Sequence, residues 1–208
     1  MKKGKNMKFK VYGLAVALCA LASSCSNSPK ENVTVSYELL ENNNPKVKEC
    51  MDVEPQYAFD VTLRGKLYGV PYKLYQVHVK NGKTERTEIV QKKTCVADSV
   101  QHVLFASIQE GKDTVRIVCK HQMKNDLRIA IPGRLCILME TYLPVESTTD
   151  DAIPLIAFTE GMTKAFEIDG RKLEGLDYCG IRDAKIHPNR WFEEFNIKNY
   201  VYFEIEFE

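Results

Sequence analysis

The chain of 208 residues carries 29 Lys and Arg against 28 Asp and Glu, so its formal net charge is only +1. This length is ample for one hydrophobic core, and a single domain is expected. The charge balance argues against a nucleic-acid-binding protein, which would show a basic patch or stripe.

The N-terminal segment is typical of an export signal. Its first ten residues include five lysines and no acid, and the twelve residues 11–22 carry no charge. Twelve residues are too few to span a membrane, which takes about 20 apolar residues, but they fit a secretory signal peptide. We expect residues 1–24 to be removed. The remaining chain would hold 24 basic and 28 acidic side chains, a formal charge of −4, which strengthens the argument against nucleic-acid binding.

The segment LASSC places small residues directly before Cys25. This ending resembles the bacterial lipobox, in which the cysteine receives a thioether-linked diacylglycerol and the chain is cut just before it. The preferred branched residue three positions before the cysteine is replaced by Ala22, with Leu21 one place earlier. The alternative is an ordinary secretory signal, which would leave Cys25 as a free thiol or a disulfide partner.

Residues 25–32 are polar and without periodicity, so they predict a flexible tether behind the lipidated cysteine. Ser26 stands where the enterobacterial inner-membrane signal has an aspartate, which favours the outer membrane. Glu31 is the one acid among the first seven tether residues, whereas the surface-export signal of Bacteroidota is an acidic run. The resemblance therefore implies a protein anchored in the bilayer by acyl chains, on the periplasmic face of the outer membrane rather than the cell surface.

Alternating apolar and polar residues dominate from residue 33 onward and predict strands, most clearly at 57–64, 113–122, 153–158 and 200–208. Two more are expected around Pro132-Gly133. In the last strand, the residues expected to face the core are Val201, Phe203, Ile205 and Phe207. Those expected to face solvent are Tyr202, Glu204, Glu206 and Glu208.

Two dipeptides predict tight hairpins. Asn81-Gly82 and Asp169-Gly170 lie between extended runs, and both suit a type I′ turn, which needs positive φ at its two central residues. The polar run 84–88 after the first turn indicates an edge strand, whose charges discourage edge-to-edge association.

Two short helices are expected. In residues 98–111, Asp98 and Gln101 form a capping-box pattern, and Gly111 can end the helix. The apolar residues that follow helical spacing there are Val100, Val103, Leu104 and Ile108. Residues 187–195 form the second candidate, with Pro188 in the first turn.

These elements indicate a mainly β fold: an antiparallel β-sandwich or open barrel with one or two short helices. We expect it to form one domain over residues 33–208.

The cysteines do not define a disulfide framework. Once Cys19 leaves with the signal and Cys25 is lipidated, the five that remain are Cys50, Cys95, Cys119, Cys136 and Cys179. An odd number cannot all pair within one chain. Bridges Cys50–Cys95 or Cys95–Cys179 stay open, whereas Cys119 and Cys136 lie in apolar strand contexts that suit small buried hydrophobes.

No motif predicts a catalytic or metal centre, and no cofactor is expected. The sequence has no C-x-x-C pair and no H-E-x-x-H helix. His121 follows Cys119 by two residues, so the two would share a strand face as a metal pair or nucleophile–base pair. The simpler interpretation is a buried thiol beside a strand-end histidine. The acids of strand 200–208 could bind a cation or a basic partner, but a solvated outer face is the simpler interpretation.

Two tripeptides, Asp98-Ser99-Val100 and Asp113-Thr114-Val115, resemble the O-glycosylation signal of secreted Bacteroidota proteins. Ser99 and Thr114 are therefore candidate modification sites.

Taken together, the lipobox, the tether and the run YQVHVKNGKTERTEIVQKK before TVRIVCK resemble small lipoproteins of Bacteroidota, a family that implies no particular activity. The first hypothesis is a non-enzymatic accessory or binding module. Its sheet edges or aromatic residues would engage a protein or glycan; these aromatic residues are Tyr68, Tyr72, Tyr75 and Trp191. The alternative is an envelope hydrolase whose site assembles only on folding. Its pocket would gather at least two of His121, His187, Asp150 and Glu193.

Overall fold

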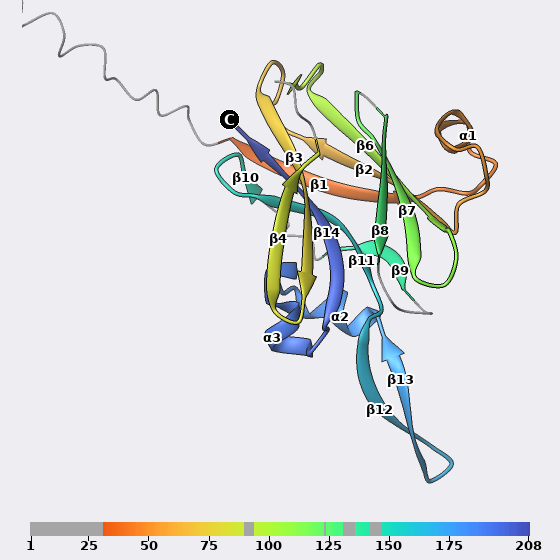
Figure 1. Cartoon of the computed structure of the whole chain (residues 1–208). Helices are drawn as coiled ribbons and strands as arrows, with labels where there is room; N and C mark the ends of the chain where they lie inside the picture. The colour runs from red at the N-terminus through yellow and green to blue at the C-terminus, as the bar shows by residue number, and fades with distance from the viewer. Residues whose placement is uncertain (1–30, 90–93, 123, 131–135, 142–146) are drawn as a thin grey trace, which may run out of the picture.

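The computed structural model describes residues 31–89, 94–122, 124–130, 136–141 and 147–208. Within them strands dominate, all strand pairs are antiparallel, and the helices are short (Figure 1). The expected fold class is therefore confirmed. The predicted signal peptide, Cys25 and the Pro132-Gly133 turn lie outside the described residues. Among those residues, no helix has the length and apolar character to cross a membrane.

The first sheet has six strands in the order β10-β1-β2-β6-β7-β8. Along the chain they are β1 (Asn32–Leu39), β2 (Tyr57–Arg64), β6 (Val100–Gln109), β7 (Thr114–Lys120), β8 (Lys124–Ala130) and β10 (Ser147–Thr148). The alternating segment at 57–64 is thus β2, with the predicted bounds.

The second sheet has the order β4-β3-β14-β11-β9, and a short strand β5 also pairs with β3. Its strands are β3 (Pro71–Lys80), β4 (Lys83–Glu88), β5 (Thr94–Cys95), β9 (Ile137–Glu140), β11 (Ile153–Thr159) and β14 (Asn199–Phe207). The last strand of the chain, β14, therefore lies in the middle of this sheet, between β3 and β11.

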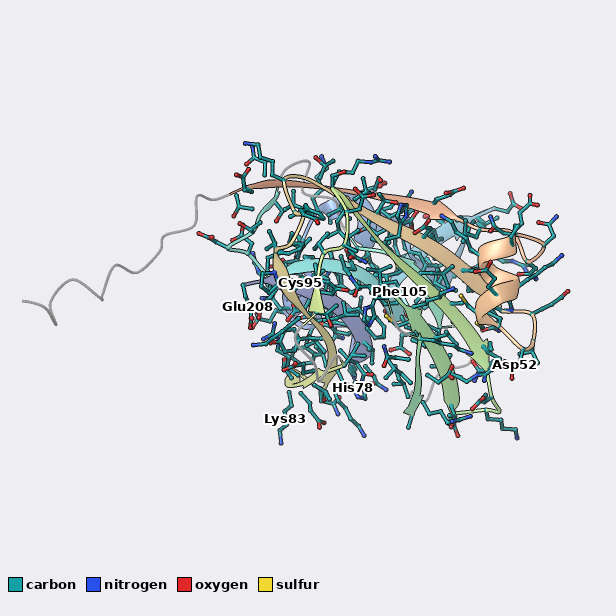
Figure 2. The ribbon with its side chains drawn as sticks, turned by 90° about the horizontal axis from the view of Figure 1, so that it is seen from above. Asp52, His78, Lys83, Cys95, Phe105 and Glu208 are labelled. Atoms are coloured by element: carbon teal, nitrogen blue, oxygen red, sulfur yellow. The ribbon has the colours of Figure 1, made fainter. Side chains whose placement is uncertain are left out.

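The main core fills the space between the two sheets. Phe105 of β6 and Phe203 of β14 meet there with ring centroids 5.0 Å apart, and Figure 2 shows Phe105 inside the molecule while Lys83 and Glu208 lie at its periphery. Val201 and Ile205 belong to the same core, which confirms the inward face predicted for the last strand.

Helices cover the outer faces of both sheets. On the first sheet lies α1 (Pro45–Cys50). On the second lie α2 (Cys179–Ala184), the 3-10 helix η1 (Pro188–Arg190) and α3 (Trp191–Phe195), which confirms the helical segment at 187–195. Trp191 is fully buried, and its Nε1 donates to the Ile186 carbonyl at 2.8 Å. Because of this cover, Tyr202 and Glu204 are buried, which corrects their expected exposure.

The helix predicted at 98–111 is wrong, because most of this segment forms β6. Val103 and Phe105 face the core between the sheets, whereas Leu104 and Ala106 face α1. A strand buried on both faces has a continuous apolar run, and such a run also contains the spacing of a helix.

Both predicted hairpins form. Asn81 and Gly82 have φ of 50° and 75°, and Asp169 and Gly170 have φ of 50° and 73°, as type I′ turns require. The first turn joins β3 to β4, and the fully exposed β4 is an edge strand, as predicted. The second joins β12 (Met162–Ile168) to β13 (Arg171–Asp177), a separate two-stranded sheet. This hairpin projects from the body at the end opposite to residue 31 (Figure 1).

Candidate functional sites

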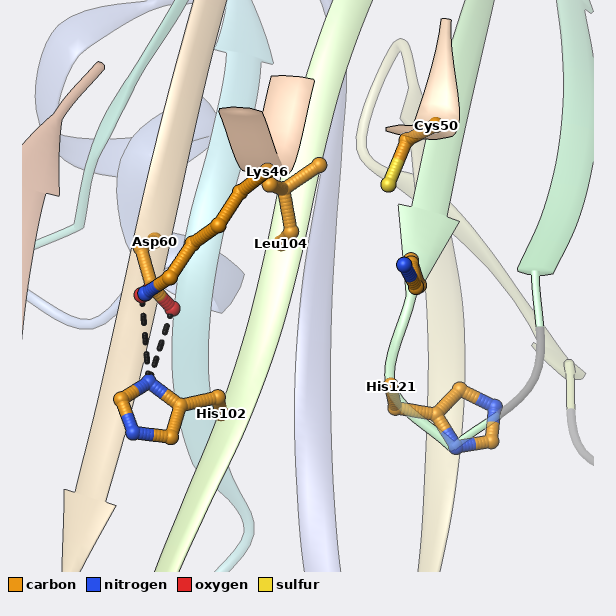
Figure 3. Close-up of a pocket in the computed structure, with 7 residues that line it drawn as sticks. Lys46, Cys50, Asp60, His102, Leu104 and His121 are labelled. Carbon is orange, nitrogen blue, oxygen red and sulfur yellow. Dashed lines mark hydrogen bonds and ion pairs between the residues drawn. The ribbon is translucent and has the colours of Figure 1, made fainter. Parts of the chain in front are cut away.

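A pocket of about 120 Å³ lies between α1 and the outer face of the first sheet (Figure 3). The sequence favours α1 at this place because the Asn44 side chain accepts from the Lys46 backbone N–H at 2.9 Å, and Pro45 occupies the first turn. The lining residues are Lys46, Cys50, Asp60, His102, Leu104, Lys120 and His121.

A buried carboxylate organises the polar half of this pocket. Asp60 of β2 is only 2% exposed. Its two carboxylate oxygens each lie 3.1 Å from His102 Nδ1 on β6, and it also forms an ion pair with Lys46 of α1. A charge taken out of water is costly unless it is paired, so these two partners explain how Asp60 is tolerated there.

An imidazole held at Nδ1 by a carboxylate turns its Nε2 outward, an arrangement suited to proton transfer. The nucleophile candidate of the pocket is Cys50, but in Figure 3 Leu104 lies between Cys50 and His102. No hydrogen bond joins these two side chains in the part of the chain that the structure describes. The pocket therefore orients an imidazole without giving it a nucleophile.

Ion pairs attach α1 and the residues that follow it to β7. Asp52 pairs with Arg116 at 2.5 Å, and Glu49 pairs with Lys120 at 3.4 Å. The hydrogen bond from Arg116 is the main cause that holds the pKa of Asp52 below its ordinary value. Together with the Lys46–Asp60 pair, these ion pairs hold α1 against the first sheet.

The four residues proposed for a hydrolase belong to different segments of the fold. His121 lines the pocket under α1, and its Nδ1 lies 3.0 Å from the Tyr72 hydroxyl; burial lowers its pKa. Asp150 lines a different pocket beside residue 31. His187 caps η1, and Glu193 is exposed on α3. His121 and Asp150 thus line separate pockets.

The five cysteines of the described residues are free, which overturns both candidate bridges. Cys50 and Cys119 are buried, Cys136 is half-buried, and Cys95 and Cys179 are exposed. Burial is the main cause that raises the pKa of Cys136, to about 12, and it raises the pKa of Cys119 as well. These two thiols therefore stay protonated, as small hydrophobes should. No cluster of three or more metal-binding side chains occurs within the described residues.

The acids of the last strand bind cations of their own sheet. Glu204 and Glu206 both contact Arg86 of β4, at 2.6 Å to Nε and 2.5 Å to Nη2. Glu208 pairs with Lys73 of β3 at 2.5 Å. The simpler interpretation of these acids, a solvated outer face, is wrong for Glu204, which is buried, and basic residues of the neighbouring strands pair with all three.

The predicted aromatic surface is mostly core. Tyr72 and Trp191 are buried, and Tyr75 lies under the Arg86 guanidinium, which is 3.4 Å from its ring centroid. Tyr68 alone of the four is largely exposed, at 77%. A glycan platform built from these side chains is therefore not available on the surface.

The candidate glycosylation sites lie at strand starts. Ser99 is exposed just before β6, where its backbone N–H donates to Asp98 Oδ1 at 2.6 Å, and Thr114 is half-buried as the first residue of β7. Their modification stays a prediction.

A different region leaves its apolar side chains uncovered. The β12–β13 hairpin exposes Phe166, Ile168 and Leu173 by 37%, 57% and 48%. Phe166 is paired directly with Leu173, and Ile168 is two residues further along β12, so all three lie on one face of the hairpin. The alternation in AFEIDGRKL contains this signal, although from the sequence it predicts only a hairpin.

The two regions differ in what they offer a ligand. The pocket under α1 has its buried charge paired within the chain, whereas the hairpin presents an uncovered apolar face. Comparisons of the chain with known protein families, with curated proteins and with solved structures find no match, so the functional argument rests on the chain's own residues.

Proposed function

We propose that this protein is a lipid-anchored, non-enzymatic binding module on the periplasmic face of the outer membrane, and that it engages a protein through the β12–β13 hairpin. The observation that carries the proposal is the exposed apolar face of Phe166, Ile168 and Leu173. Contiguous apolar surface on a folded protein is typical of an interaction site. A lone two-stranded hairpin is also only marginally stable in water, so it gains from a partner.

The position of the hairpin supports this function. Residue 31, where the predicted tether meets the domain, lies at the other end of the molecule (Figure 1). An anchor at Cys25 would therefore leave the hairpin facing away from the bilayer. Tyr68 and Glu31 line the same pocket at the tether end, and an exposed tyrosine is suited to the polar interface of a membrane.

A pull-down tests the hairpin. The lipidated full chain would be cross-linked in envelope membranes, recovered and analysed by mass spectrometry. We expect Phe166→Ser combined with Leu173→Ser to reduce recovery of the bound protein about tenfold, which corresponds to about 1.4 kcal/mol. Leu39→Ser combined with Val53→Ser is the matched control, because these exposed apolar residues lie on the body. Equal recovery by both double variants would contradict the proposal.

Incorporation of labelled palmitate tests the anchor separately. Wild type should take up the label, and Cys25→Ala should not. Equal labelling of the two proteins would exclude lipidation at Cys25.

A further inference from the structure

We infer that the hairpin's partner is a second copy of this chain, with β13 paired antiparallel to β13 of the second copy about Leu173. The inference rests on the proposed function, because it names the occupant of the same apolar face.

The outer edge of β13 is available for such pairing. Its inner edge pairs with β12, in a register that runs from Ile168–Arg171 at the turn to Met162–Asp177 at the base. No other strand of the described residues joins this two-stranded sheet. In an antiparallel ladder closed by a two-residue turn, hydrogen-bonded pairs alternate with non-bonded pairs starting at the turn. The backbone groups of Lys172 and Glu174 therefore point to the outer edge.

The charges of β13 select one register. Two-fold symmetry requires the strand to pair with itself about a single residue. Centred on Leu173, the pairing places that leucine opposite the second copy's Leu173, Lys172 opposite the second copy's Glu174, and Glu174 opposite the second copy's Lys172. Opposite charges across a strand pair are stabilising, and like charges are destabilising.

The neighbouring registers are worse. Centring on Arg171 or Lys172 would place that charge opposite its own copy, with the repulsion that this brings. Centring on Glu174 would oppose the two glutamates; it would also place Arg171 opposite the second copy's Asp177, but Asp177 already pairs with Lys164 of its own hairpin at 3.1 Å. Centring on Gly175 would bring no two opposite charges together. The ladder pattern agrees with the Leu173 register, because Lys172 and the second copy's Glu174 would then form a hydrogen-bonded pair through their outward backbone groups. Pairing of β12 with β12 of the second copy lacks this advantage. Its opposite charges, Lys164 and Glu167, are an odd number of residues apart, so no two-fold register places one opposite the other.

The same register brings exposed apolar side chains of the two copies side by side. Phe166 lies beside Leu173 within one hairpin, so the two hairpins together form a row of Phe166, Leu173 and their two equivalents across a four-stranded sheet. The Phe166 ring lies over Gly175 of its own hairpin, where an added Cβ would meet Phe166 Cε2 at 2.9 Å. A sheet needs three or more strands with an apolar face to be stable by itself. The four-stranded sheet of the two hairpins meets this requirement, whereas one hairpin alone does not.

Charge exchange between copies tests the register. Two differently tagged forms of the full chain would be co-expressed and co-purified from membranes. Lys172→Glu alone places glutamates opposite each other, and Glu174→Lys alone does the same with lysines, so each should reduce co-purification with itself about tenfold. A Lys172→Glu copy co-expressed with a Glu174→Lys copy regains both opposite-charge pairs and should recover the wild-type level. Each variant keeps its own folding defect in this mixture, so the recovery cannot come from improved folding.

Disulfide formation between copies tests separately whether the two-fold axis passes through the Leu173 pair. Directly opposed residues have Cβ atoms about 4.5–5.5 Å apart, so Leu173→Cys should yield a covalent dimer on mild oxidation. The background would be Cys95→Ser with Cys179→Ser, because those thiols are exposed. Ile168→Cys is the matched control, because it lies on the same face but off the axis.

The outcomes separate the two proposals. Wild-type self-association without rescue in the mixed pair would overturn the Leu173 register. Absence of wild-type self-association would overturn the second copy as partner. If the pull-down still recovered a different protein that depends on Phe166 and Leu173, the proposed function would stand without this inference.

Discussion

Strands β14 and β13 both carry an apolar residue between two charged ones, Ile205 in β14 and Leu173 in β13, but their surroundings are opposite. β14 lies between two strands, with the main core on one face and the cluster around Trp191 on the other. β13 has one neighbour, and its apolar residue Leu173 is 48% exposed. The comparison shows that alternation decides which residues share a face, while the rest of the chain decides whether that face is covered.

The charged residues of the two strands also differ in burial and pairing. In β14, Glu204 is buried and bound by Arg86. In β13, Lys172 and Glu174 are both exposed, and side chains in water gain little from pairing within one molecule. The acids of β14 are therefore part of the fold, whereas Lys172 and Glu174 of β13 are available to pair across an interface.

Truncation of one apolar side chain in each strand should give the largest difference in the free energy of unfolding. Phe203→Ala removes a fully buried ring and should lower the free energy of unfolding by about 3–5 kcal/mol. Leu173→Ala should change it by about 0.5 kcal/mol or less, as surface substitutions do. Urea unfolding of dilute protein measures both. Similar losses would show that the hairpin packs like the core.

Neutralising one acid in each strand should have a smaller effect. Glu204→Gln keeps the side-chain shape but weakens a charged hydrogen bond to Arg86, for an expected loss of about 1–3 kcal/mol. Glu174→Gln should cost less than about 0.5 kcal/mol. Urea unfolding gives the losses, and hydrogen exchange of β4 should increase in the first variant alone. If Glu204→Gln changed neither the free energy of unfolding nor hydrogen exchange of β4, Arg86 would not hold β4 to the sheet.

The smallest expected effect is a loss of stability at acidic pH, caused by His187 in the helical cover of β14. His187 lies against Tyr202, with ring centroids 6.0 Å apart, and burial lowers its pKa despite opposing contributions from Asn189 and Glu204. The folded protein thus favours the neutral ring. This contribution to stability is present above about pH 6.5, the ordinary histidine pKa, and is lost as the pH falls through the lowered value.

The His187→Asn variant isolates that contribution. Asparagine can accept the Asn189 N–H in place of the imidazole Nδ1. Unfolding measured between pH 7 and pH 5 should depend less on pH in the variant, by less than about 1.4 kcal/mol per pH unit, the limit for one proton. Identical pH dependence in both proteins would contradict a buried neutral ring.

The sequence predicted features that depend on local chemistry. Asn81-Gly82 and Asp169-Gly170 adopt the positive φ angles that their turn type needs. The bounds of β2 and the inward face of β14 followed from alternation alone. Each of these depends on the residue itself and its immediate neighbours along the chain.

Features that depend on distant segments were missed. β6 was mistaken for a helix because α1 covers its second face and removes the polar alternation. Asp60 was one of several polar residues in β2, and its pairing with Lys46 and His102 joins segments up to 42 residues apart. No local pattern contains such information, because burial and pairing are decided by which surfaces meet.

The place of β14 has a consequence for biogenesis. Strands β3 and β11 flank β14 on either side, so the second sheet stays divided until residues 199–207 have left the ribosome. A chain whose central strand is synthesised after its neighbours remains open during translation. Its second sheet is therefore completed only after β14 itself has been synthesised.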